Sequence, residues 1–439
     1  MSLASSVGIR FRGPSHIIMG AIVALMAFIF TSQVYANSFS STAFLQSSQP
    51  AAFELFGISV AADGNLLAVG ATNDFVGPGS VYIFKLVPGT NGGHPSWVLQ
   101  ATLHAPDGFT NDQFGRSVAI QGNTLVAAAP NAMGTGGQTG AAYVFVNTNG
   151  TWTLQAKLSP QDTNHEIGFG FGASPICISG NTIAVGAPDA PDSFAPVLQQ
   201  GAVYVFTNDG GVWKQQAHIV PDDPQVAELG FDLSLQNDTL LIGAPGSSVG
   251  GLSEVGAAFI YTRVDGGWTQ QANLQPPIVA QDAFFGTGVS LDRSTAAVGA
   301  PGIGTASVFS ENNGPWALQQ QITGPVLNSD SDFATNLKVI GDVLLIGAYE
   351  DFRSSDELQT GTAFVYRQGG STWTEQSDLR MAPEQNGLPG PGVANQRFAN
   401  LVTMTHIGST TLFVLGSPGL SNPALREGSV GGVYTTILN

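Results

Sequence analysis

A unit of about 57 residues recurs seven times along this chain. Each copy opens with an aromatic residue or leucine, usually followed by Gly or Ala, as in Phe114-Gly115. The copies begin near residues 56, 114, 171, 229, 285, 333 and 398. Units of this size bury their apolar faces only against neighbouring copies, so the repeat restricts the chain to a solenoid or a ring.

Four strand signals follow one another within each copy. The first is an alternating run such as 117–120, and the second is a run of small residues such as 185–188. The third strand is aromatic, as in 202–206, and a Gly-rich hairpin leads to the fourth, as in 152–158. This order predicts four-stranded antiparallel sheets, which makes the fold class all-β.

Short turns separate the first and second strands of every copy. Their residue types accept the positive φ of tight hairpins. They are predicted at Asp63-Gly64, Gly122-Asn123, Gly180-Asn181, Asn237-Asp238, Asp292-Arg293, Gly341-Asp342 and Gly408-Ser409.

The fourth strands distinguish a ring from an open array. Six of them begin at a tryptophan: Trp97, Trp152, Trp213, Trp268, Trp316 and Trp373. The seventh copy ends after its third strand, at 432–437, while 41–46 near the start of the chain resembles a fourth strand. The N-terminal strand therefore completes the last copy and removes the open edges. We predict one seven-bladed β-propeller of four-stranded blades over residues 37–439.

Composition agrees with this fold and excludes several partners. The chain has 56 Gly and 25 Pro, which punctuate many short strands, and only 10% charged residues. A net charge of −17 without a basic stretch argues against nucleic acid and anionic membranes. Cys177 is the only cysteine, so no internal disulfide forms, and its apolar neighbours indicate a buried side chain rather than a reactive thiol.

The first 36 residues have the pattern of a secretory signal peptide. Arg10 and Arg12 precede an apolar run at 17–30, and small residues up to Ala36 suit a signal peptidase. The run is short for a membrane span, so we expect cleavage after Ala36, with an uncleaved anchor as the alternative. The mature protein is then secreted, extracellular or periplasmic.

The Phe-Gly openings and Gly-Ala-Pro strands resemble the FG-GAP repeat family, known from the N-terminal propeller of integrin α subunits and from bacterial secreted proteins. The resemblance implies an extracellular propeller that binds proteins or glycans, often with calcium in some blades. In integrins the calcium loop is of the Asp-x-Asp-x-Asp-Gly type and joins the first two strands of a blade. Here those positions hold only tight turns, too short for the ligands that calcium takes, so we predict no cofactor and no calcium cage of the family type.

One acidic loop region is the candidate binding site. Residues 328–332 carry oxygen-bearing side chains at alternate positions, and a second loop of the same blade adds four acids. The candidate ligand-binding residues are Asp330, Asp332, Glu350, Asp351, Asp356 and Glu357. They form either a solvated acidic loop or a cation or ligand site.

No catalytic constellation is present in the sequence. Its histidines have no recurring spacing and Gly-x-Ser-x-Gly is absent, so we predict a protein that is not an enzyme. The tryptophans are either blade-packing residues or platforms for sugar rings, and their repeat position favours packing. The recurring Gln of the fourth strands is interpreted as marking a solvent face.

The variable loops should all lie on one face. These are the loops that enter the first strands and those between the second and third strands, and they carry most of the acids. Recognition sites usually lie on such loops. We therefore predict a monomeric, secreted binding or adhesion propeller whose acidic loop-rich face recognises an extracellular protein or glycan. The alternatives are a lectin-like propeller and a secreted polysaccharide hydrolase or lyase.

Overall fold

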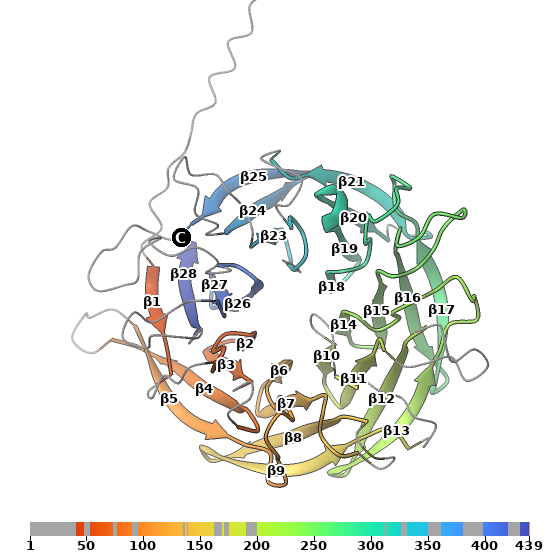
Figure 1. Ribbon diagram of the computed structural model, residues 1–439. Coiled ribbons are helices and arrows are strands. Elements are labelled where there is room, and N and C mark those ends of the chain that lie inside the picture. The colour runs from red at the N-terminus through yellow and green to blue at the C-terminus, as the bar shows by residue number, and fades with distance from the viewer. Residues whose placement is uncertain are drawn as a thin grey trace, which may run out of the picture. The chain divides into compact units, whose positions relative to one another are not determined.

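Seven four-stranded antiparallel sheets form a ring in the computed structural model of this chain (Figure 1). The structure describes residues 41–47, 53–72, 77–89, 95–134, 137, 139–161, 169–170, 175–189, 200–311, 314–325, 332–349, 361–380, 398–419 and 431–438. The signal-peptide prediction for residues 1–36 lies outside them. The all-β seven-bladed propeller predicted from the repeats is confirmed.

The strands occupy four positions, counted outward from the ring axis. The innermost strands are β2 (Ser59–Asp63), β6 (Val118–Gln121), β10 (Ile176–Ser179), β14 (Leu233–Gln236), β18 (Val289–Asp292), β22 (Leu337–Ile340) and β26 (Leu401–Ile407). The second strands are β3 (Leu66–Ala71), β7 (Thr124–Ala129), β11 (Thr182–Ala187), β15 (Thr239–Ala244), β19 (Thr295–Ala300), β23 (Val343–Ala348) and β27 (Thr410–Ser417).

The third strands are β4 (Ser80–Val87), β8 (Ala141–Thr148), β12 (Ala202–Asp209), β16 (Ala257–Val264), β20 (Thr305–Ser310), β24 (Thr362–Gly369) and β28 (Gly432–Leu438). The outermost strands are β5 (Ser96–Leu103), β9 (Thr151–Leu158), β13 (Val212–Ile219), β17 (Gly267–Leu274), β21 (Ala317–Thr323), β25 (Thr372–Leu379) and β1 (Ser41–Leu45). A short 3₁₀ turn, η2 (Pro301–Ile303), follows β19.

The N-terminal strand closes the last blade, as predicted. β1 pairs antiparallel with β28, with Phe44 opposite Tyr434 and Leu45 opposite Val433, in a sheet of order β1-β28-β27-β26. The two ends of the propeller therefore share one sheet (Figure 1).

The turns between first and second strands are tight in all seven blades, but two lie one residue later than predicted. In the first blade the turn is Gly64-Asn65, and in the fifth it is Arg293-Ser294. The first residue of each of these turns has positive φ, which Arg293 adopts at 53° without being glycine. Asp63 and Asp292 instead end their strands and contact the next blade.

The Phe-Gly opening of a blade forms backbone hydrogen bonds with the preceding blade. Phe114 is fully buried and pairs with Gly79 of the preceding blade, while the Gly115 N–H donates to the Ala128 carbonyl of its own second strand at 2.8 Å. In the third blade these positions are held by Phe169 and Gly170, two residues before the Phe171 that the repeat spacing selects. The sequence there reads Phe-Gly-Phe-Gly, so spacing alone could not distinguish the two.

The hydrophobic core lies between blades rather than within one layer. One cluster, for example, joins Val126 and Val144 of the second blade to Val185 and Tyr204 of the third. Within the described part of the chain, no helical segment has the length and hydropathy that a membrane crossing requires.

Hydrogen bonds around the axis also join the blades. A side chain on one innermost strand accepts a backbone N–H from the next blade. Pairs of this kind are Asp63 with Gly122 (2.6 Å), Gln121 with Gly180 (2.6 Å), Ser179 with Asn237 (2.9 Å), Asp292 with Gly341 (2.7 Å) and Thr405 with Gly64 (2.8 Å). The rim of the central channel is therefore built from polar side chains that the fold itself requires.

Candidate functional site

The loop face of the propeller comprises the connections into the innermost strands and those between second and third strands. Neighbouring connections of these two kinds touch: the Phe114 N–H donates to Pro78 at 2.8 Å, and Leu229 to Gln200 at 2.9 Å. The opposite side, the turn face, carries the tight turns after the innermost strands and the hairpins between third and fourth strands.

The candidate acidic site is described at only one of its six residues. Asp332 is half-buried, and its backbone carbonyl accepts the N–H of Thr335 at 3.2 Å and the hydroxyl at 2.9 Å. This turn leads into Phe333, which is buried against Phe364. Asp330, Glu350, Asp351, Asp356 and Glu357 lie outside the described residues, so the site stays a prediction.

Large apolar side chains are exposed on the described loops of the same face, a feature that sequence patterns did not indicate. Phe109 is 68% exposed and Met133 56% exposed, in connections on either side of the second blade's innermost strands. Among the described residues, those exposed on this face are Phe53, Phe109, Met133, Val220, Leu252, Ile278 and Val279. Other exposed apolar residues, such as Val212 and Val264, lie on outer strands, so the loop face shares this feature with the rest of the described surface. Phe109 is the most exposed of them all, and an apolar side chain this exposed is one that a partner could cover.

Acidic side chains are also exposed on the loop face. Asp222, Asp223, Glu254 and Asp282 are exposed on loops of the third to fifth blades. The pKa of Glu228 is raised, first by burial and then by the negative charges of Asp189 and Glu254. Carboxylates from neighbouring loops therefore lie close enough to repel one another, which favours a positively charged partner.

One basic side chain near this face is already engaged. The Lys157 ammonium donates to Asp107 at 2.6 Å, and the Tyr143 hydroxyl donates to the other oxygen of that carboxylate at 2.8 Å. The hydrogen bond from Lys157 is the main cause of the lowered pKa of Asp107. This pair ties an outermost strand to a loop, and it leaves neither group free for a ligand.

The tryptophans pack between blades, as their repeat position suggested. Trp152 and Trp373 are buried, and the Trp213 indole N–H donates to Gln155 of the preceding outermost strand at 2.8 Å. Trp268 donates in the same way to Gln216 at 3.1 Å. Gln155 is exposed, as expected for a residue on the solvent face, and Gln216 is half-buried. Both also accept a hydrogen bond from the next blade.

No group of three or more His, Cys, Asp or Glu side chains in the described ranges is arranged to hold a metal ion. The turns after the innermost strands contain two residues each, so they offer too few oxygens for a calcium cage.

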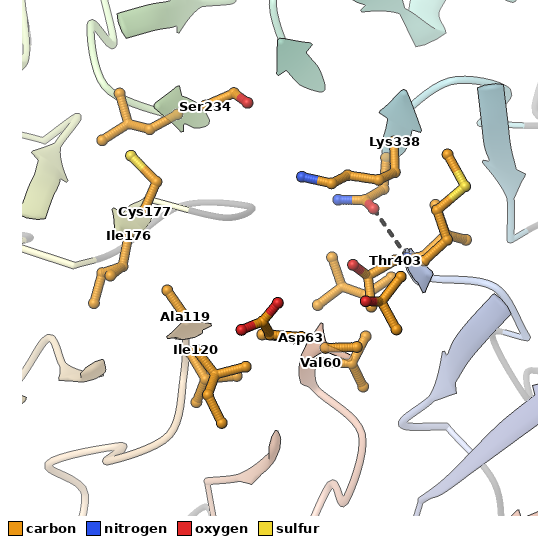
Figure 2. A pocket seen from close by; sticks show the side chains of 18 of the residues that line it. Val60, Asp63, Ala119, Ile120, Ile176, Cys177, Ser234, Lys338 and Thr403 are labelled. Atoms are coloured by element: carbon orange, nitrogen blue, oxygen red, sulfur yellow. Dashed lines mark hydrogen bonds between the residues drawn. The ribbon is translucent and has the colours of Figure 1, made fainter. Parts of the chain in front are cut away.

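The central channel is lined by the innermost strands, and two ionisable residues, Asp232 and Lys338, are among its lining residues. Figure 2 shows Lys338 in this lining. Asp232 accepts the N–H groups of Leu233 at 2.8 Å and Val289 at 2.7 Å, and it is only 2% exposed. Burial raises the pKa of Asp232 to about 7, although both hydrogen bonds and the charge of Lys338 oppose the shift. Burial lowers the pKa of Lys338, and the negative charge of Asp232 opposes that change.

The raised pKa of Asp232 predicts an unusual pH dependence of folding stability. Between its unfolded pKa of about 3.9 and its folded pKa, Asp232 binds more protons in the folded state, so stability falls as pH rises through that window. The melting temperature should therefore be a few degrees higher near pH 5 than near pH 7.5. Asp232→Asn should flatten this slope in calorimetric scans, and an equally steep slope in the variant would assign the effect to other acids.

Comparison with known proteins identifies a repeat family that matches this chain. The FG-GAP repeat profile matches residues 39–84, 97–145, 152–206, 213–261 and 268–313, together more than half of the chain. No curated protein matches this sequence. Among solved structures, a crystal structure of a protein from Lactobacillus plantarum is similar, with 14% identity over 73% of this chain and 84% of that chain. Its TM-score is 0.46, a likeness too distant to add to the argument.

Proposed function

We propose, from the premise that this chain belongs to the FG-GAP repeat family, that it is a secreted binding propeller whose loop face recognises an extracellular protein. The observation that carries the proposal is the combination of exposed apolar side chains and carboxylates on that face. Export is supported by the signal-peptide pattern of residues 1–36.

Both kinds of side chain have a role in such an interface. Apolar anchors such as Phe109 and Ile278 supply buried area when a partner covers them, and buried anchors usually carry most of the binding energy. Carboxylates such as Asp222 and Asp223 would form a charged rim that steers a basic partner and excludes acidic ones. The partner is therefore a basic protein surface, or one that a cation bridges to the acids.

Catalysis has less support than binding. FG-GAP propellers are typically non-catalytic, and the described acid–base contact of the loop face, Asp107 with Lys157 and Tyr143, lies between an outermost strand and a loop. A secreted hydrolase or lyase would need a carboxylate pair positioned on either side of a bond.

The lectin alternative is weakened by the tryptophans. A sugar platform needs an exposed aromatic face, whereas Trp152 and Trp373 are buried and Trp213 and Trp268 donate to the neighbouring blade. Replacing Trp152 should lower stability rather than remove glycan binding selectively.

Matched substitutions on the two faces test the binding proposal. The loop-face variant carries Phe109→Ser, Ile278→Ser, Asp222→Asn and Asp223→Asn. The turn-face variant carries Val212→Ser, Val264→Ser, Asp209→Asn and Asp265→Asn, which change the same kinds of exposed side chain. Residues 37–439 of each are immobilised and exposed to extracellular proteins of the source organism, and the captured protein is titrated by biolayer interferometry.

The loop-face variant should bind the captured protein at least about tenfold more weakly, and the turn-face variant within about twofold of the wild type. Raising salt from about 0.05 to 0.3 M should weaken wild-type binding if a basic partner meets the acids. Loss of binding only in the turn-face variant would contradict the proposal.

A further inference from the structure

The central channel has a polar arc and an apolar arc on its wall. Within the strands, residues two apart share a face, so each innermost strand points alternate side chains toward the axis. On the later blades, the polar arc consists of Ser234, Asn336, Lys338 and Thr405. Ala61, Ala119 and Cys177 form the apolar arc on the first three blades. Figure 2 shows Lys338 extending into the channel, with Ala119, Ile176 and Cys177 on other parts of the wall.

The neutral groups of the polar arc have their acceptor atoms occupied by the fold. Ser234 Oγ accepts the Leu291 N–H at 2.9 Å, Asn336 Oδ1 accepts the Val402 N–H at 2.9 Å, and Thr405 Oγ1 accepts the Gly64 N–H at 2.8 Å. A hydroxyl that accepts still carries its own hydrogen, and the amide still carries its NH₂ group. What the arc can offer a ligand is therefore mainly hydrogen-bond donors.

Lys338 adds a positive charge to these donors. In the described part of the chain its ammonium group donates no hydrogen bond and forms no salt bridge, although the negative charges of Asp232 and Asp292 act on it. The nearby carboxylate of Asp232 accepts two backbone N–H groups instead, and Asp292 accepts from Gln236 at 2.7 Å and Gly341 at 2.7 Å. Three N–H donors and a charge, set among hydroxyl and amide donors, are the complement of an anion.

The rest of the channel limits the anion's shape. Its volume is about 260 Å³. Asp63 points into the channel from the first blade and would repel a negative group placed beside it. The negative end of a ligand therefore belongs beside Lys338, and an apolar body would meet the small side chains of the apolar arc.

We propose that the central channel binds a small monocarboxylate, with its carboxylate on the polar arc and a short apolar body against the apolar arc. This site is separate from the loop face and does not depend on the proposed function. Its ligand is an aliphatic or aromatic acid of few carbons rather than a compact inorganic anion.

Calorimetric titration of residues 37–439 with butyrate tests the proposal. The wild type should bind butyrate saturably at one site per chain, and sulfate at the same ionic strength should bind at least about tenfold more weakly. Lys338→Met keeps the length of the side chain without its charge, and it should lower butyrate affinity at least about tenfold. Lys338→Arg should stay within a few fold of the wild type.

Lys214→Met is the matched control, because Lys214 is exposed on the outermost strand β13. It should leave butyrate affinity unchanged, and a thermal scan of each variant confirms folding. No saturable binding up to about 50 mM butyrate, or equal affinity of the Lys338→Met variant, would overturn the proposal. Sulfate binding as tight as butyrate would overturn the choice of a carboxylate.

Discussion

Replacing Gly243 with alanine should lower the free energy of unfolding by about 3 kcal/mol or more. Gly243 lies in the second strand of the fourth blade, where an added Cβ would stand 2.0 Å from the Gly286 carbonyl oxygen of the next blade. The oxygen that the added Cβ would meet belongs to the backbone and cannot rotate away, so the two blades would have to separate. The Gly286 backbone is held in place by its own blade, because its N–H donates to the Gly299 carbonyl at 2.9 Å. Urea denaturation of both proteins measures the difference.

Gly369→Ala is the control for the effect of alanine itself. Gly369 ends β24 on the turn face, is exposed, and has no atom within 4 Å of an added Cβ. The free energy of unfolding of the Gly369→Ala variant should stay within about 0.5 kcal/mol of the wild-type value. A Gly243→Ala variant as stable as the Gly369→Ala variant would show that the blades do not meet as closely as the structure has them.

The same contact explains why the repeat could be detected in the sequence. Close approach between blades demands Gly at the second strand, and the positive φ of Gly115 demands a residue that tolerates it. These local requirements recur in most blades, although the second blade has Ala128 in its second strand, so the pattern predicted the number of blades. The count of fourth strands predicted the closure by the N-terminal strand. It was less reliable for exact positions: the third blade opens at Phe169 because two Phe-Gly pairs are adjacent, and the turn in the fifth blade begins at Arg293.

Contacts that differ between blades could not be predicted in this way. The exposed apolar residues of the loop face, such as Phe109, lie in connections of unequal length with no shared pattern. The hydrogen bond from Trp213 to Gln155 joins residues 58 positions apart in the sequence, so it requires the ring to be placed first. Lys338 likewise has the sequence pattern of an ordinary strand residue. Its position in the channel wall follows only once the seven innermost strands are arranged around one axis.

Deleting residues 37–47 should lower the melting temperature by about 10 °C or more and cause aggregation. The deletion removes β1, so the backbone groups of β28 that now pair with Ser41, Ala43, Phe44 and Leu45 become an open sheet edge. It also removes the Phe44 ring, whose centroid is 4.8 Å from that of Tyr434. Phe44→Ala should cost only a few degrees, because it keeps the strand pairing. Calorimetry and size-exclusion chromatography measure both effects, and a monomeric deletion variant with unchanged melting temperature would contradict closure by β1.

A circular permutant separates the loss of the strand from the loss of chain length. In the other blades the outermost strand follows the third strand through a hairpin, as β25 follows β24. Moving residues 37–49 to follow Asn439 gives the seventh blade the same connection, because β1 runs antiparallel to β28 with Ser41 opposite Thr436. This permutant should recover most of the melting temperature that the deletion loses. The same residues appended in scrambled order should not, because only the native order places Phe44 opposite Tyr434 and Leu45 opposite Val433.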